Sequence, residues 1–177
     1  MLKTPYFASM QGRSIGMDRD RRWEKIELAV DTMTGYGAHT LTSPIQYIHD
    51  QYSKDIYDEF ITPTLFDKDF AIKKDDSVFF LNFRPDRAKQ ISIAFCDGRF
   101  SHFENKVRPH YFLCMSPYID EEMPHVPILF NREKVKGTLC EFLSGHNLKQ
   151  LKIAETEKYA HVTYFFNGGA KKPFSGE

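Results

Sequence analysis

Residues 77–81, an apolar run of Ser-Val-Phe-Phe-Leu that ends shortly before two arginines, constrain the fold more than any other stretch. A short apolar run that follows polar residues is typical of a buried strand. Arg84 and Arg87 would leave the C-terminal end of this strand together, where open α/β sheets bind their ligands. Two planar guanidinium groups directed at one point match the oxygens of a phosphate or a carboxylate. The run therefore predicts an anion site, with the alternative that both arginines pair with Asp86 or other acids on the surface.

Short apolar runs alternate with segments of helical periodicity, which predicts a layered α/β fold. Strands are expected at residues 6–10, 77–81, 111–115 and 151–154. Helices are expected from about residue 20 to Gly35 or Gly37, from the cap Ser43 to about residue 60, and over 88–96, 138–143 and 159–166. Pro124, Pro127 and the charged segment 131–134 interrupt the pattern, so a domain boundary is expected there.

The composition excludes several function classes. The 24 Lys and Arg residues are balanced by 24 Asp and Glu residues, which argues against a broad basic face for nucleic acid or an anionic membrane. No apolar stretch approaches the roughly 20 residues of a membrane span, and the first residues lack the pattern of a signal peptide, so a cytoplasmic location is expected. Cys96, Cys114 and Cys140 lie in apolar surroundings without C-x-x-C spacing, which favours free buried thiols over a disulfide or a zinc site.

A second pair of arginines, Arg13 and Arg19, lies in the expected loop 11–20. Gly12 and Gly16 are expected to let the backbone adopt unusual conformations and approach a ligand closely. The helix that starts near residue 20 would add a partial positive charge. The competing interpretation is a solvated helix start, in which the basic residues pair with their acidic neighbours: Arg19, Arg21 and Arg22 with Asp18 and Asp20.

Lys158 is a third candidate for anion binding. It lies in the opening turn of the last expected helix, where a lysine is unfavourable unless an anion is present. The alternative is a surface lysine that pairs with Glu155 or Glu157.

Three separated motifs occupy residues 12–24, 82–88 and 153–169. The first contains Gly-Arg at 12–13, Met-Asp-Arg-Asp at 17–20 and Arg-Trp-Glu at 22–24; the second is Asn-Phe-Arg-Pro-Asp-Arg-Ala. The third runs from Ile153 through Ala-Glu-Thr-Glu-Lys-Tyr-Ala-His-Val-Thr to Asn-Gly-Gly at 167–169. In this order the motifs closely resemble the cofactor-independent phosphoglycerate mutases over essentially the whole chain. The resemblance implies that residues 1–130 are the C-terminal portion of a phosphotransferase, substrate-binding domain. Residues 131–177 would then be the truncated start of an alkaline-phosphatase-like α/β metal domain.

By the same resemblance, the substrate-binding residues are Arg13, Arg19, Arg84, Pro85, Asp86, Arg87 and Lys158. Asp86 would orient the arginines beside it, and Lys158 would reach the same substrate from the metal domain. Residues 14–16 read Ser-Ile-Gly, whereas the family usually has two tyrosines and an alanine between the arginine and the methionine. This departure concerns the packing of the loop and leaves the charge pattern intact.

The family's reaction is the interconversion of 3-phosphoglycerate and 2-phosphoglycerate, an isomerase step of glycolysis and gluconeogenesis. It passes through a phosphoserine and uses two divalent ions, normally manganese. The serine and the metal ligands of the family lie outside the matched motifs, so no catalytic and no metal-binding residue is expected in this chain. The chain is expected to be an interior fragment that is inactive alone and has phosphoglycerate and complementary fragments of the same enzyme as partners. The alternative is a non-catalytic module or remnant that binds a phosphorylated metabolite.

Overall fold

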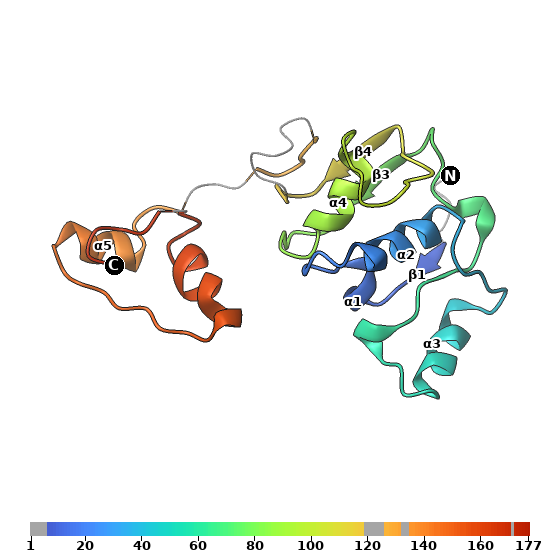
Figure 1. Cartoon of the computed structure of the whole chain (residues 1–177), viewed down its shortest axis with the longest axis horizontal. Helices are drawn as coiled ribbons and strands as arrows, with labels where there is room; N and C mark the ends of the chain where they lie inside the picture. The colour runs from blue at the N-terminus through green and yellow to red at the C-terminus, as the bar shows by residue number, and fades with distance from the viewer. Residues whose placement is uncertain (1–6, 119–125, 132–134, 171) are drawn as a thin grey trace, which may run out of the picture. The chain divides into compact units, whose positions relative to one another are not determined.

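The computed structural model of the chain describes residues 7–118, 126–131, 135–170 and 172–177. The chain forms two compact units, Met1–Asn131 and Arg132–Glu177 (Figure 1). The first unit combines helices with strands, which confirms the expected α/β class. Within the described residues, no helix has the length and apolar character that a membrane span needs.

A strand, a helix and a second strand form the centre of the first unit. β3 (Ser77–Phe80) is followed by α4 (Lys89–Cys96) and β4 (Tyr111–Cys114), and the two strands are parallel. Parallel neighbours need a crossover connection, which α4 provides here. A single bridge between Cys114 and Ile128 adds a third row to this sheet. The strands and the helix expected in this region are therefore confirmed to within a residue or two.

The burial of β3 differs from the expectation. Val78 and Phe80 are half-buried, whereas Ser77 and Phe79 are exposed, with 45% of Phe79 accessible. The prediction of a buried strand therefore holds for one face only. Alternate side chains of a strand point to opposite faces of the sheet, and within this unit Val78 and Phe80 are the side chains that pack against the core.

α2 (Trp23–Met33) supplies one side of the core, next to α4 (Figure 1). Ile26, Ala29 and Val30 are at most 1% exposed, because their helical spacing brings them onto one face. The remaining buried members of this core are Ala88, Ile91, Ala94, Phe95, Phe112, Cys114 and Tyr118. The helix begins at Trp23, a few residues later than expected, and Gly35 follows its end with a left-handed φ of 89°.

α3 (Pro44–Tyr52) is shorter than the helix expected to reach residue 60. Its start is as expected, since the Ser43 side chain accepts a hydrogen bond from the Gln46 N–H (3.3 Å). The Gln46 side chain donates to Asp50 (2.8 Å) instead of completing the capping box. Asp55, with a left-handed φ of 59°, lies beyond the helix end, and a 3₁₀ turn, η1 (Asp58–Phe60), follows.

Two short strands and further turns complete the first unit. β1 (Ser9–Met10) pairs antiparallel with β2 (Thr64–Leu65), so the strand expected at 6–10 is limited to two residues; Tyr6 lies outside the described residues. The expected loop 11–20 contains a helical turn, α1 (Arg13–Gly16), which the sequence did not indicate. A 3₁₀ turn, η2 (Lys68–Phe70), precedes β3.

The second unit holds α5 (Leu139–Gly145), close to the helix expected over 138–143. The Thr138 side chain caps it by accepting from the Glu141 N–H (3.3 Å). Residues 151–154 form no strand, contrary to the prediction. Leu151 and Ile153 alternate as in a strand, but they are 84% and 80% exposed, so the apolar pattern has no face to pack on among the described residues. The last expected helix, over 159–166, is present, but most of it is a π-helix, η4 (His161–Phe165), which follows two α-helical residues at 159–160. A 3₁₀ turn, η3 (Thr156–Lys158), precedes it.

Candidate anion-binding site

The turn after β3 brings Arg84 onto Asp86. Arg84 Nε donates to Asp86 Oδ1 (2.6 Å) and Nη2 donates to Oδ2 (3.1 Å), so the guanidinium engages both carboxylate oxygens. The turn is shaped by Asn82, whose side chain accepts from the Arg84 N–H (3.1 Å) and donates to the Arg84 carbonyl (2.9 Å). Pro85 follows, and its carbonyl accepts from the Ala88 N–H (3.1 Å), which leads the chain into α4.

Arg19 reaches the same carboxylate from the other arginine pair. Its Nη1 lies 3.3 Å from Asp86 Oδ2, and 33% of its side chain is exposed. Burial raises the pKa of Asp86, but hydrogen bonds and charges from Arg84 and Arg19 outweigh this, and the pKa lies below the usual 3.8. The same hydrogen bond to Asp86 raises the pKa of Arg84. Asp86 therefore stays ionised and draws two guanidinium groups together.

Arg87 is half-buried and connects the two segments a second time, because its Nη1 donates to the Met17 carbonyl (3.2 Å). We call Arg19, Arg84, Asp86 and Arg87 the arginine cluster. A pocket of about 440 Å³ opens beside it, lined by Arg19, Arg21, Trp23, Asp86, Lys89, Gln90, Ile93, Asp97 and His102. Segments 67 residues apart in the sequence thus meet at one carboxylate.

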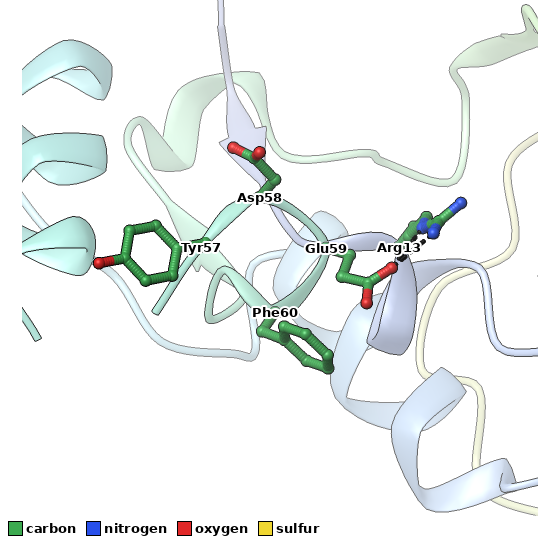
Figure 2. A pocket seen from close by; sticks show the side chains of 5 residues that line it. All are labelled: Arg13, Tyr57, Asp58, Glu59 and Phe60. Atoms are coloured by element: carbon green, nitrogen blue, oxygen red, sulfur yellow. Dashed lines mark hydrogen bonds and ion pairs between the residues drawn. The ribbon is translucent and has the colours of Figure 1, made fainter. Parts of the chain in front are cut away.

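Arg13 lies in a different setting. Its Nε and Nη2 both contact Glu59 Oε2, at 2.7 and 2.6 Å, as the dashed lines in Figure 2 show. Together with Tyr57, Asp58 and Phe60, this pair lines a pocket of about 550 Å³ (Figure 2). The carboxylate partner of Arg13 is thus Glu59 and not Asp86, and 56% of the arginine side chain is exposed.

Gly12 and Gly16 do not have the role expected of them. Gly12 has an ordinary φ of −70°, and a Cβ there would lie 2.3 Å from the Glu59 carbonyl oxygen. A Cβ at Gly16 would lie 2.8 Å from the Gln11 side chain. Both glycines allow close packing within the chain, and neither has a left-handed φ, so the prediction that they adopt unusual backbone conformations is wrong.

The start of α2 also differs from the expectation of a free helix terminus for an anion. The Asp18 side chain lies just before the helix and accepts from the N–H groups of Asp20 (2.9 Å) and Arg22 (3.0 Å). Gln90 of α4 contacts it as well (3.1 Å). Asp18 was expected only as a surface partner for neighbouring arginines, yet it is fully buried. Its spacing of four residues from Arg22 is the one signal in the sequence for this arrangement.

Lys158 belongs to the second unit, at the end of η3. Its Nζ lies 3.7 Å from Glu157 Oε1 and 53% of its side chain is exposed. The lysine is thus weakly paired with the acid that the alternative interpretation named. Nothing in this local geometry conflicts with contact to an external anion.

The described residues give little support for metal binding or for catalysis by a thiol. Among them, no group of three or more His, Cys, Asp or Glu side chains could hold a metal ion, so they do not fit a metal centre. The three cysteines are free thiols. Burial raises the pKa of Cys96 to about 12 and that of Cys114 to about 11, which makes both poor nucleophiles.

A family model described as BPG-independent PGAM N-terminus matches residues 2–120. The chain belongs to the family of 2,3-bisphosphoglycerate-independent phosphoglycerate mutases. A second model, described as Metalloenzyme superfamily, matches residues 117–177. The resemblance drawn from the three motifs is thereby confirmed at the level of the family.

Comparisons with individual proteins support the same family. The phosphoglycerate mutase of Helicobacter pylori is 47% identical over 171 residues, which is 96% of this chain and 34% of the relative. The Clostridium tetani enzyme of the same name is 44% identical over 99% of this chain. A crystal structure of Leishmania mexicana phosphoglycerate mutase, at low cobalt concentration, superposes with a TM-score of 0.73 at 28% identity and covers 95% of this chain. The chain spans about a third of the length of these proteins (32% to 35%).

Proposed function

We propose that this chain is the part of a phosphoglycerate mutase that binds the substrate, in the interconversion of 3-phosphoglycerate and 2-phosphoglycerate. The observation that carries the proposal is the arginine cluster, where Arg19 and Arg84 meet at Asp86 and Arg87 ties the two segments together. Phosphoglycerate carries a phosphate and a carboxylate, and planar guanidinium groups bind both kinds of oxygen with paired hydrogen bonds.

Asp86 would orient the cluster until the substrate arrives. More than half of the Arg84 side chain (57%) is exposed, so an anion can reach it from solvent while Asp86 holds its other edge. Pro85 fixes the turn between the two residues. We assign Arg13 and Lys158 to the same substrate as outer contacts, which requires Arg13 to exchange Glu59 for the anion. Exposed ion pairs contribute only about 0–1 kcal/mol, so this exchange costs little.

The two matched families suggest how substrate binding and metal binding are distributed along the protein. We propose that residues 1–130 are the substrate-binding part of a phosphotransferase domain and that residues 131–177 begin an alkaline-phosphatase-like metal domain, in line with the matches at 2–120 and 117–177. The divalent ions, manganese by resemblance, would be held by residues outside the described part of this chain. The serine that accepts the phosphoryl group would come from the same complementary portion of the protein.

Calorimetric titration of the 177-residue chain with 3-phosphoglycerate tests the site directly. Contacts to charged groups are worth about 1.5–3 kcal/mol, so Arg84→Ala should weaken binding about 10- to 150-fold, and Arg84→Ala/Arg87→Ala further. Arg99→Ala is the matched control, because Arg99 also pairs with an aspartate two residues away but lies beyond the C-terminal end of α4 and is 81% exposed. Equal affinity in wild type and the double variant would contradict the proposal.

A mutase assay tests whether the chain binds the substrate without catalysing the reaction. The purified chain with manganese and 3-phosphoglycerate should show no turnover, since we assign it substrate contacts and not the phosphoryl acceptor. Activity should appear when the chain replaces the aligned segment of the Helicobacter pylori relative, which is 47% identical to it. Robust turnover by the isolated chain, or an inactive but folded chimaera, would contradict this assignment.

A further inference from the structure

Asp18 is a charged side chain with no exposed surface. Its Oδ2 accepts from two backbone N–H groups, and its Oδ1 accepts from Arg22 Nε (2.8 Å) and lies 2.7 Å from Arg22 Nη2 in an ion pair. A buried carboxylate is tolerated only when it is paired and fully hydrogen-bonded. Burial raises the pKa of Asp18, but the hydrogen bonds from Arg22, Gln90 and Asp20 prevail and the pKa lies below the usual 3.8. These partners keep Asp18 ionised inside the protein.

Gln90, in the first turn of α4, uses both ends of its amide on the same segment. Its Nε2 donates to Asp18 Oδ2 (3.1 Å), and its Oε1 accepts from the Arg21 N–H (2.9 Å). A carboxylate only accepts and a backbone N–H only donates, so a single orientation of the amide satisfies both bonds. Gln90 is 5% exposed and lies one helical turn after Asp86. The segment that carries Arg19 is therefore attached to the helix that follows Arg84 and Arg87.

The segment needs this attachment to keep its conformation. Arg21 has a left-handed φ of 59°, which costs a residue other than glycine about 1–2 kcal/mol. Arg19 itself is held to Asp86 by a contact of 3.3 Å on a side chain that is one-third exposed. Such a contact is worth about 0–1 kcal/mol and cannot impose the backbone path. The bonds of Asp18 and Gln90 can, because they are buried or part-buried and fix the residues on both sides of Arg19.

We propose that Asp18 is a positioning residue of the anion site: with Gln90 as its partner, it fixes the segment 17–22 on α4 and so places Arg19 beside Asp86. This rests on the proposed function, since it assigns Asp18 a part in the binding of the same phosphorylated acid. Asp18 itself touches no ligand, because its oxygens are fully occupied by protein donors.

A double-mutant cycle on the affinity for 3-phosphoglycerate separates positioning from general stability. Asp18→Asn keeps the size of the side chain and removes its charge, and it should weaken binding about 10-fold, comparable to one lost charge-assisted contact. In an Arg19→Ala background the same substitution should change affinity less than about two-fold, since there is no longer an Arg19 to position. Losses that multiply in the double variant would overturn the proposal.

Two further variants keep the test decisive if Asp18→Asn folds poorly. Gln90→Met has similar volume but lacks both amide bonds, and it should weaken binding about as much as Asp18→Asn. Asp20→Asn is the matched control, because Asp20 also pairs with Arg22 (2.7 Å) yet its side chain is 61% exposed. An equal loss in Asp20→Asn would overturn the proposal.

Amide hydrogen exchange in the ligand-free chain gives a readout that does not depend on phosphoglycerate. The N–H groups of Asp20, Arg21 and Arg22 should exchange about 10-fold faster in Asp18→Asn and Gln90→Met, while those of Ile26 to Val30 in α2 stay unchanged. Unchanged exchange at all three groups would overturn the positioning role. If wild type showed this protection but bound no 3-phosphoglycerate, the proposed function would fail while Asp18 and Gln90 would still be shown to hold the segment.

Discussion

Burial separates the roles of the two aspartates that contact arginines near the site. Asp86 is 26% exposed and its partner Arg84 57%, so their ion pair can rearrange cheaply when an anion approaches. Asp18 has no exposed surface, so a carboxylate that lost its partners there could not replace them with water. Asp86 is thus suited to release a guanidinium to a substrate, and Asp18 is suited to hold a backbone in place.

The depressed pKa of Asp18 predicts how its contribution depends on pH. Its pKa lies below 3.8 in the folded chain, so the unfolded chain takes up a proton first as the pH falls. The stabilisation is fully present above 3.8 and is lost as the pH falls through the folded pKa. The melting temperature of wild type should therefore exceed that of Asp18→Asn at pH 6, and the difference should shrink below pH 3.8.

Thermal unfolding followed by circular dichroism from pH 7 to pH 3 is the measurement. Asp20→Asn, whose carboxylate is 61% exposed, should follow wild type over the same range. A difference between wild type and Asp18→Asn that stays constant with pH would show that charge is not what Asp18 contributes.

Among the elements, the contact between Gly12, which caps α1, and the η1 turn shows how closely two segments of the first unit are packed. The Gly12 N–H donates to the Ile61 carbonyl (2.8 Å), and a Cβ at Gly12 would lie 2.3 Å from Glu59 O and 2.7 Å from Ile61 N. Backbone atoms cannot move aside as a flexible side chain can. The turn that carries Glu59, the partner of Arg13, therefore depends on a glycine at position 12.

Gly12→Ala should destabilise the chain by about 1–3 kcal/mol, the usual cost of forcing atoms into a packed site. Gly98→Ala is the matched control, because a Cβ there meets no atom within 4 Å, and it should stay within about 0.5 kcal/mol of wild type. Urea unfolding followed by Trp23 fluorescence measures both. Equal midpoints for the two variants would contradict the packing argument.

Elements whose signals are local were predictable from the sequence. β3, α4 and β4 have clear periodicity, and Ser43 and Thr138 cap their helices as the residue types indicate. The helix expected to reach residue 60 ends at Tyr52, because nothing in the apolar spacing announced the left-handed Asp55. Residues 151–154 have the alternation of a strand but no strand partner among the described residues. A strand depends on a neighbour that local sequence does not name.

The candidate site, too, could be predicted only in part from the sequence. The arginines were found because guanidinium groups beside a strand end carry a chemical signal of their own. Their meeting at Asp86 joins residues 67 apart in the sequence, and the attachment of Asp18 to Gln90 joins residues 72 apart. Neither distance could be derived from spacing along the chain. Burial of Asp18 was missed because an aspartate next to arginines is most often on the surface.

The whole molecule combines two units with very different cores. The buried cluster around Ile26, Phe95 and Phe112 lies entirely in the first unit. Among the described residues of the second unit, Cys140 is the only apolar side chain in the fully buried core, and Leu139, Phe142, Leu151 and Ile153 are all more than half exposed. Short segments that bury little apolar surface gain little stability. The second unit should therefore be the less stable of the two.

Urea unfolding with two local probes tests this inequality. Trp23 is the single tryptophan of the chain and reports on the first unit, whereas the buried thiol of Cys140 reports on α5 of the second. Labelling of Cys140, followed by mass spectrometry, should reach its midpoint at roughly 1 M lower urea than the Trp23 fluorescence change, because midpoints scale with stability. Cys114, which is 2% exposed and lies in β4, is the internal control and should become reactive together with the Trp23 change. If all three transitions coincided, the chain would unfold as one cooperative body, and the thin core of the second unit would have to draw its stability from the first.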